Sequence, residues 1–200
     1  LAMYRFMKAT GVESFCGLTK QDIVLKGMSY FHQAIQLGEK AYDDFHEAEG
    51  WSPSCLEFMQ HLSNRYFNRA MFLLTVKGDH ENPEEIEERG MRDLQIARDM
   101  DVEIVDQGTE VGWNVNTVEK LFSVTLNRTR GHLLLIEMGY HDDWDIEELL
   151  EDAFRTLKKE LKKKHLSGLF RELGPTGRMQ QIETELMRYK VLKGDMDTAS

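Results

Sequence analysis

The chain has 200 residues, of which 41% are hydrophobic and 10% aromatic, and only three are proline. These values exclude a disordered chain and a turn-rich β-sandwich. Thirty-five acidic residues against 25 basic ones give a net charge of −10. Such a charge argues against a broad nucleic-acid-binding or anionic-membrane surface.

No run of residues approaches the about 18 apolar positions that a membrane-spanning helix needs. We therefore expect a soluble chain without membrane insertion. Cys16 and Cys55 are the two cysteines, and they form neither a CxxC pair nor a cluster with histidine at zinc spacing. Neither a disulfide framework nor a structural metal site is expected, and a reducing, cytoplasmic location fits best.

Apolar residues recur at three- and four-residue spacing between residues 19 and 48, which predicts a long amphipathic helix. A glycine, a tryptophan and Pro53 then interrupt the pattern. The same period returns after Pro53 and predicts a second helix over 54–77. We expect Gly78 to close this helix in the left-handed conformation.

A strong helix start follows at Asn82-Pro83-Glu84-Glu85. Asparagine is a favoured N-cap, proline fits the first helical turn, and carboxylates interact well with the positive end of the helix dipole. These residues predict a helix over 82–100. Residues 101–116 contain two glycines and several β-branched residues, so we predict a loop there with some extended structure.

Helical periodicity resumes over 117–138 and is followed by a turn at 139–143. Asp143 or Asp145 is the expected N-cap of a helix that reaches about residue 164, with acidic residues at its start and lysines at its end. A connection over 168–177 leads to a last helix over 178–192, which we expect Lys193-Gly194-Asp195 to end. The predicted fold class is therefore all-α.

Glycine turns at 11, 78, 139 and 194 divide the chain into helix pairs over about 1–50, 54–100 and 117–165, with an incomplete pair from 178. A triplet of small, large and small residues recurs in the second helices of the first two pairs, as Gly27, Phe31, Ala34 and as Gly90, Leu94, Ala97. Small residues let two helices approach closely while the large residue fills the groove. We expect both triplets at helix contacts.

The Lys77-Gly78-Asp79 turn recurs as Lys193-Gly194-Asp195. Together with the triplets, this pattern resembles the tetratricopeptide repeat (TPR) family, in which a Gly-Asp turn separates the two helices of a repeat. The resemblance covers most of the chain, with long repeats of about 60 residues. It implies antiparallel helical hairpins stacked into a right-handed superhelix, an α-solenoid, that forms one domain over 1–200. We expect the chain to be a piece of a longer protein.

No sequence motif marks a catalytic or cofactor site, since P-loop, nucleophile-elbow, zincin and dinucleotide-binding strings are all absent. Asp99, Asp101 and Glu103 approach the spacing of a calcium-binding loop, but Ile104 stands where that loop needs glycine. Three aspartates beside His141 are explained by helix capping. We predict no catalytic residue, no cofactor and no metal site.

Polar side chains form stripes on the helices over 54–77 and 117–138. The first helices of TPR-like proteins line the concave surface, so the resemblance implies that these stripes form a groove. Asparagine amides can bind a peptide backbone, and arginine forks match carboxylates. The candidate partner-binding residues are Asn64, Arg65, Asn68, Asn127, Arg130 and, on the last helix, Arg188. Two solvated helix faces are the alternative interpretation.

These patterns predict a protein-interaction module that is not an enzyme and binds a peptide or helix of a partner protein on its concave face. An acidic partner would suit the arginines of the stripes, and no nucleic-acid partner is expected. The alternative is a structural or self-association domain that positions other domains of a larger signalling or cytoskeletal protein.

Overall fold

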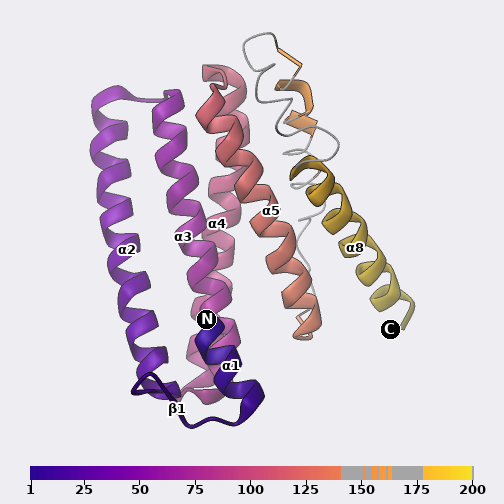
Figure 1. The fold of residues 1–200 in the computed structure, drawn as a ribbon. Helices are drawn as coiled ribbons and strands as arrows, with labels where there is room; N and C mark the ends of the chain where they lie inside the picture. Colours follow the sequence, from indigo (N-terminus) through magenta and orange to yellow (C-terminus); the bar gives the residue numbers. More distant parts are fainter. Residues whose placement is uncertain (141–150, 152–154, 157, 161, 164–177, 200) are drawn as a thin grey trace. The chain divides into compact units, whose positions relative to one another are not determined.

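The computed structural model describes residues 1–140, 151, 155–156, 158–160, 162–163 and 178–199. These residues are mostly α-helical (Figure 1), which confirms the all-α fold class for this part of the chain. None of the helices in these ranges has the length and apolar character needed to cross a membrane. Whether the helices stack into a TPR-like superhelix remains a prediction.

The chain divides into two compact units. Unit 1 comprises Leu1–Ala48 and His61–Met100, and unit 2 comprises Glu49–Gln60 and Asp101–Ser200. Their elements are, in chain order, α1 (Ala2–Thr10), β1 (Ser14–Phe15), β2 (Leu18–Thr19), α2 (Lys20–Glu49), α3 (Pro53–Val76), the 3₁₀ turn η1 (Lys77–Asp79), α4 (Pro83–Val111), α5 (Val115–Glu137) and α8 (Arg178–Ala199).

A short β-hairpin, absent from the sequence prediction, connects α1 to α2 in unit 1. Its two strands are antiparallel and pair Ser14 with Thr19. Cys16 and Gly17 form the turn, with φ angles of 52° and 74°. Two positive φ angles in a two-residue loop are typical of a hairpin turn whose twist matches the strands. Cysteine rarely adopts a positive φ angle. Of the two turn residues, only Gly17 is therefore of a type that indicates a hairpin turn in the sequence.

Thr19 and Asp22 fix the start of α2. The Thr19 backbone N–H donates to the Asp22 carboxylate at 2.9 Å, and the Asp22 backbone N–H donates to the Thr19 hydroxyl at 3.1 Å. These reciprocal bonds satisfy N–H groups that a helix start leaves without partners. The helix predicted over 19–48 is confirmed, and Gly50, with a φ of 65°, follows its last residue.

Helices α2 and α3 run antiparallel in unit 1, and two glycines of α2 permit their close approach. A Cβ atom added at Gly27 would overlap the ring of Phe72, and one added at Gly38 would overlap the guanidinium of Arg65. Phe72 belongs to a buried cluster with Tyr4, Val24 and Val76. The predicted contact at Gly27 is therefore confirmed.

Helices α3 and α4 form the second antiparallel pair of unit 1. A Cβ added at Gly90 would lie 2.9 Å from the Leu74 side chain. Leu94 and Ala97, the other members of this triplet, are 2% and 1% exposed. The Ser63 hydroxyl donates to the Ala97 carbonyl oxygen at 3.1 Å. The second triplet lies at a helix contact, as predicted.

The loop predicted over 101–116 is wrong, because α4 continues to Val111. Two contacts within unit 2 hold this extension, in which Ile104 is buried: Asp101 pairs with Arg128, and the Trp113 ring lies against Gly108. These tertiary contacts outweigh the low helix propensity of the local valines and glycines.

Helix α5 begins at a capping box, in which the Asn114 side chain accepts from the Thr117 backbone N–H at 2.9 Å. The helix predicted over 117–138 is thus confirmed, with a start two residues earlier. Gly139, with a φ of 82°, follows its C-terminal end. The ion pairs Arg130–Glu185 and Arg188–Glu137 show that α5 and α8 run in the same direction.

Two predicted helix ends are wrong. Gly78 does not adopt the left-handed conformation and lies within η1. The His80 backbone N–H donates to the Lys77 carbonyl oxygen at 3.1 Å and closes this turn. Helix α8 passes through Lys193-Gly194-Asp195 and ends at Ala199. The predicted N-caps Asp143 and Asp145 and the connection over 168–177 lie outside the described residues.

Candidate functional site

A buried ion pair joins α3 to α4 in unit 1. The Arg69 guanidinium donates through Nε and Nη2 to the two oxygens of Asp93, at 2.6 and 2.7 Å. The same guanidinium lies over the Tyr66 ring, 5.3 Å from its centroid. A bidentate pair has a strict geometry, so it specifies one alignment of the two helices. Sequence reasoning did not single out these residues, because no local pattern links positions 24 residues apart.

A second buried pair joins α4 to α5 in unit 2. Arg128 Nε donates to Asp101 Oδ2 at 2.7 Å, and Nη2 donates to Oδ1 at 3.3 Å. Asp101 was the central acid of the calcium-like spacing, and its carboxylate is engaged by Arg128. A continuous helix also cannot fold around a cation as a loop does. Within the described ranges, no group of three acids, histidines or cysteines has the arrangement of a metal site.

Three of the candidate partner-binding residues, Asn64, Arg65 and Asn68, lie on α3 in unit 1. Arg65 Nη1 donates to the Ala34 carbonyl oxygen of α2 at 2.7 Å, in the space that Gly38 leaves open. The guanidinium therefore joins two helices of the chain itself. Asn64 and Asn68 are half-buried.

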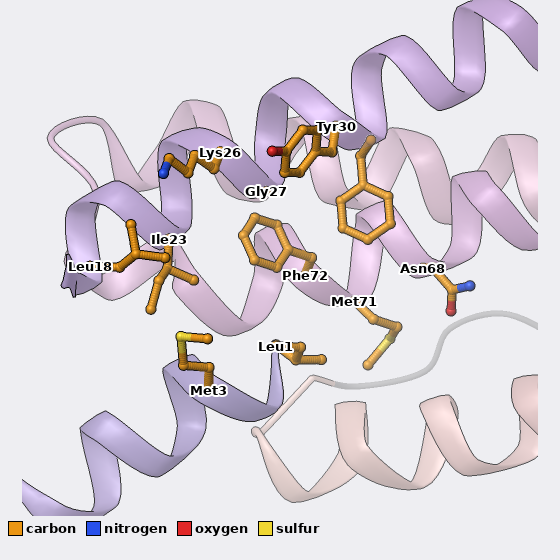
Figure 2. A pocket seen from close by; sticks show the side chains of 11 residues that line it. Leu1, Met3, Leu18, Ile23, Lys26, Gly27, Tyr30, Asn68, Met71 and Phe72 are labelled. Carbon is orange, nitrogen blue, oxygen red and sulfur yellow. The ribbon is translucent and has the colours of Figure 1, made fainter. Parts of the chain in front are cut away.

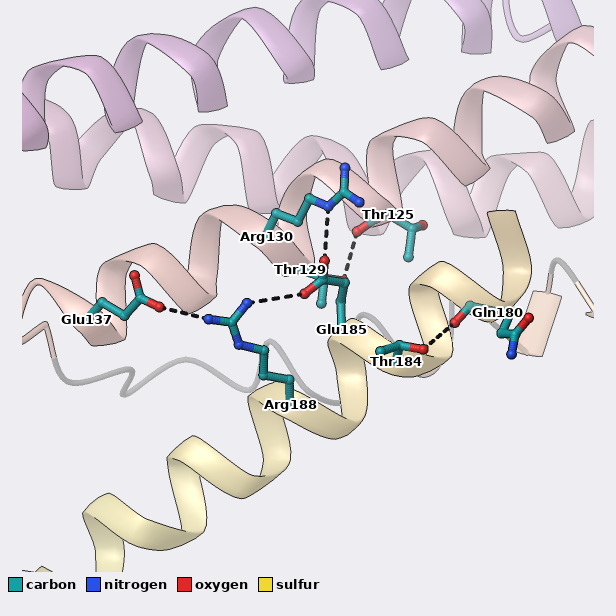
Figure 3. Close-up of polar contacts among 8 residues, drawn as sticks. All are labelled: Thr125, Thr129, Arg130, Glu137, Gln180, Thr184, Glu185 and Arg188. Carbon is teal, nitrogen blue, oxygen red and sulfur yellow. Dashed lines mark hydrogen bonds and ion pairs between the residues drawn. The ribbon is translucent and has the colours of Figure 1, made fainter. Parts of the chain in front are cut away.

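The other three candidates, Asn127, Arg130 and Arg188, lie in unit 2, where the two arginines meet at one acid (Figure 3). Arg130 Nε lies 3.2 Å from Glu185 Oε1, and Arg188 Nη1 lies 3.9 Å from Glu185 Oε2. Arg188 also pairs with Glu137 at 3.1 Å. All three arginines of the predicted groove thus contact their own chain. A groove lined by all six residues remains a prediction.

An apolar cavity of about 590 Å³ lies in unit 1 between the N-terminal segment and helices α2 and α3. We call it the α2–α3 cavity. Figure 2 shows Phe72 and Met71 in its middle, Asn68 at one end, and Leu18 with Lys26 at the other. Its lining residues are Leu1, Met3, Leu18, Ile23, Lys26, Gly27, Tyr30, Phe31, Asn68, Met71 and Phe72.

The lining of the α2–α3 cavity is suited to binding apolar groups. Its volume lies within the range of about 300–1,000 Å³ that is typical of ligand sites. Lys26 is the one lining residue with a charged side chain, and Asn68 supplies an amide. Only Asn68 was among the candidates from the sequence. The cavity combines residues more than 65 positions apart in the chain, so periodicity within one helix could not reveal it.

Comparisons of the chain with models of protein families, with curated proteins and with solved structures found no match. The function of the chain is therefore inferred from the geometry of the site.

The two cysteines are free thiols, with Cys16 exposed and Cys55 buried. Burial raises the pKa of the Cys55 thiol above its usual range. Because the thiolate is the reactive form, this shift disfavours nucleophilic chemistry at Cys55.

Two buried phenols of unit 1 make its stability sensitive to alkaline pH. The Tyr66 hydroxyl donates to Glu39, and the Tyr4 hydroxyl donates to Asp79. Burial, followed by these hydrogen bonds, raises the pKa of both phenols well above the ordinary value of 10.0. A folded-state pKa above the unfolded value contributes stability that is complete below the unfolded pKa and is lost as pH rises further.

We therefore expect the free energy of unfolding to fall as pH rises above about 10, and Tyr66→Phe to reduce the steepness of this fall. Urea unfolding at about pH 8 and about pH 11 would measure the effect. Tyr30→Phe, which removes the hydroxyl of an exposed tyrosine, is the matched control. Equal pH dependence in wild type and Tyr66→Phe would contradict the prediction.

Proposed function

We propose that the chain is a TPR-like protein-interaction module that binds an apolar segment of a partner protein in the α2–α3 cavity. The observation that carries the proposal is this cavity, an apolar site with one charged side chain at its rim. A residue of the predicted groove, Asn68, contributes to its lining.

The rim of the cavity supports a protein partner. Tyr30 lines the cavity and is nevertheless 68% exposed, so a bound segment would bury its ring. Tyrosine is enriched among the residues that dominate binding energies at protein interfaces. The lining offers Lys26 and Tyr30 as its titratable side chains, with no acid and base paired for catalysis. A binding role without chemistry fits this composition best.

Selection of binders from a random peptide library displayed on phage tests the proposal. We expect enriched peptides to contain apolar or aromatic residues and to bind the wild-type chain at least about ten-fold more tightly than the Tyr30→Ser variant. Removing a large aromatic contact from an interface commonly has an effect of this size.

Leu25→Ser is the matched control. Leu25 is an exposed apolar residue of α2, 57% accessible, and is not part of the cavity lining. Its replacement should leave peptide binding unchanged. The proposal is wrong if no peptide is enriched, or if the enriched peptides bind wild type and Tyr30→Ser equally well.

A further inference from the structure

We infer that α1 regulates the α2–α3 cavity as an internal competitor, a segment of the chain that a partner displaces in order to bind. This inference rests on the proposed function and adds regulation to the same site. Three features of unit 1 support it: α1 closes one side of the cavity, it covers an apolar surface that continues from the cavity, and its attachment to the rest of the unit is limited.

The start of α1 closes one side of the α2–α3 cavity. Leu1 and Met3 belong to the lining, and the other lining residues lie within 18–31 and 68–72. Figure 2 shows the Leu1 and Met3 side chains reaching from the N-terminal segment into the space that Phe72 faces. The N-terminal segment therefore supplies apolar side chains to the cavity, as the bound segment of a partner would.

The apolar surface of the cavity continues beneath α1. Tyr4 is completely buried in a cluster with Val24 of α2 and with Phe72 and Val76 of α3. Phe72 also lines the cavity, so cavity and cluster share one surface of α2 and α3. Loss of α1 from this surface would expose the cluster to water, and a partner that took the place of α1 would bury it again.

Helix α1 contacts this surface through one face. Met3 is half-buried, and Tyr4 and Met7 are completely buried. Their spacing places all three on one side of a helix, whereas Arg5 and Lys8 are exposed. An amphipathic helix that lays its apolar face into a hydrophobic groove is a recurring mode of peptide recognition. Helix α1 is therefore bound to α2 and α3 in the manner of a peptide ligand.

The attachment of α1 depends mainly on two buried side chains, those of Tyr4 and Met7. The Tyr4 hydroxyl also donates to Asp79 in η1. Phe6 contacts Phe15 of the hairpin, with 5.4 Å between the ring centroids, but these rings are 48% and 40% exposed. Displacement of α1 would thus leave the glycine contacts between α2 and α3 in place.

The connection between α1 and the hairpin permits this displacement. Residues 8–17 are all exposed, and a Cβ atom added at Gly11 or Gly17 would meet nothing within 4 Å. The packing of α2 against α3 therefore does not restrain this stretch. Helix α1 has nine residues, and isolated helices of this length are marginal in water. We expect α1 to unfold when it leaves the surface.

Hydrogen exchange of the wild-type chain, measured by mass spectrometry with a peptide from the phage selection as the probe, tests the inference. When the peptide is bound, the amides of residues 5–10 should exchange at least about ten-fold faster, because a displaced α1 loses its helical hydrogen bonds. If α1 is a fixed wall of the cavity, the peptide will slow exchange in residues 5–10 or leave it unchanged. Either of these two results would overturn the inference.

Two variants weaken the attachment of α1 by removing one hydrogen bond from either side. Tyr4→Phe keeps the buried ring and loses the hydroxyl, and Asp79→Ala removes the acceptor, which is exposed and outside the cavity lining. The apparent affinity of a site rises with the fraction of molecules in which it is open. Each variant should therefore bind the peptide about three-fold more tightly than wild type, or better. The double variant should gain no more than either single one.

Tyr66→Phe is the matched control. Tyr66 is also a buried tyrosine whose hydroxyl donates to a carboxylate, that of Glu39, and neither residue belongs to α1 or to the cavity lining. This variant should bind the peptide like wild type. Unchanged or weaker binding by both Tyr4→Phe and Asp79→Ala, or an equal gain in Tyr66→Phe, would contradict the inference.

The results separate this inference from the proposed function. If library peptides bind the wild-type chain and lose affinity for Tyr30→Ser, while exchange in α1 does not rise, the proposed function stands and the inference is wrong. If no library peptide is enriched, the proposed function fails and the inference fails with it.

Discussion

Replacing Arg69 by methionine should lower the free energy of unfolding by about 3–5 kcal/mol, measured by urea denaturation. The substitution keeps a long apolar side chain but leaves the Asp93 carboxylate, 2% exposed, without its guanidinium partner. A buried charge without compensation is among the most destabilising features a folded chain can contain.

Two further variants separate the lost pair from lost packing. Arg92→Met removes an exposed pair with Glu88 on the same helix, and it should cost less than about 1 kcal/mol. The double variant Arg69→Met/Asp93→Leu removes both buried charges and should recover most of the lost stability. If the double variant is less stable than Arg69→Met alone, a buried carboxylate is not the cause of the loss.

Gly108→Ala should destabilise unit 2 by about 1–3 kcal/mol, although alanine is the better helix former. An added Cβ at Gly108 would overlap the Trp113 ring, which is 5% exposed and so has little room to move. Without this clash, the same substitution in a helix interior would be favourable by about 1 kcal/mol. Thermal unfolding followed by circular dichroism gives the sign of the change.

Gly194→Ala provides the opposite case in the same unit. Gly194 lies within α8, and a Cβ added there meets nothing within 4 Å. This variant should raise the melting temperature or leave it unchanged. The combination Gly108→Ala/Trp113→Leu should recover part of the loss by making space. Equal effects of the two glycine substitutions would show that the Trp113 contact does not decide the outcome.

Local signals in the sequence were sufficient to place most helix starts. Asn82, Pro83 and the two glutamates after them act through groups within one turn of each other, so their effect is visible in the sequence itself. The end of α4 depends instead on contacts of Asp101 and Gly108 with residues of the following helix and turn. Propensity therefore predicted a loop where tertiary packing holds a helix.

The candidate site was predictable only in part, for a similar reason. Polar periodicity on α3 identified Asn68 but could not show that Arg65 bonds to the Ala34 carbonyl of the neighbouring helix. The sequence also cannot tell which apolar residues of α2 pack against α3. That choice depends on the two glycines, Gly27 and Gly38, at which α3 approaches.

The contact of Arg65 with α2 determines more than the distance between two helices. Sliding α2 along α3 by one turn, about 5.4 Å, would bring Ala34 or Tyr42 to the place where Gly38 makes room for the guanidinium. Either Cβ would overlap the guanidinium where it bonds to the Ala34 carbonyl, so this bond favours the observed position of α2 along α3. The side chains of α2 and α3 therefore keep the same positions relative to one another, and a molecule that binds to both helices meets one fixed arrangement of side chains.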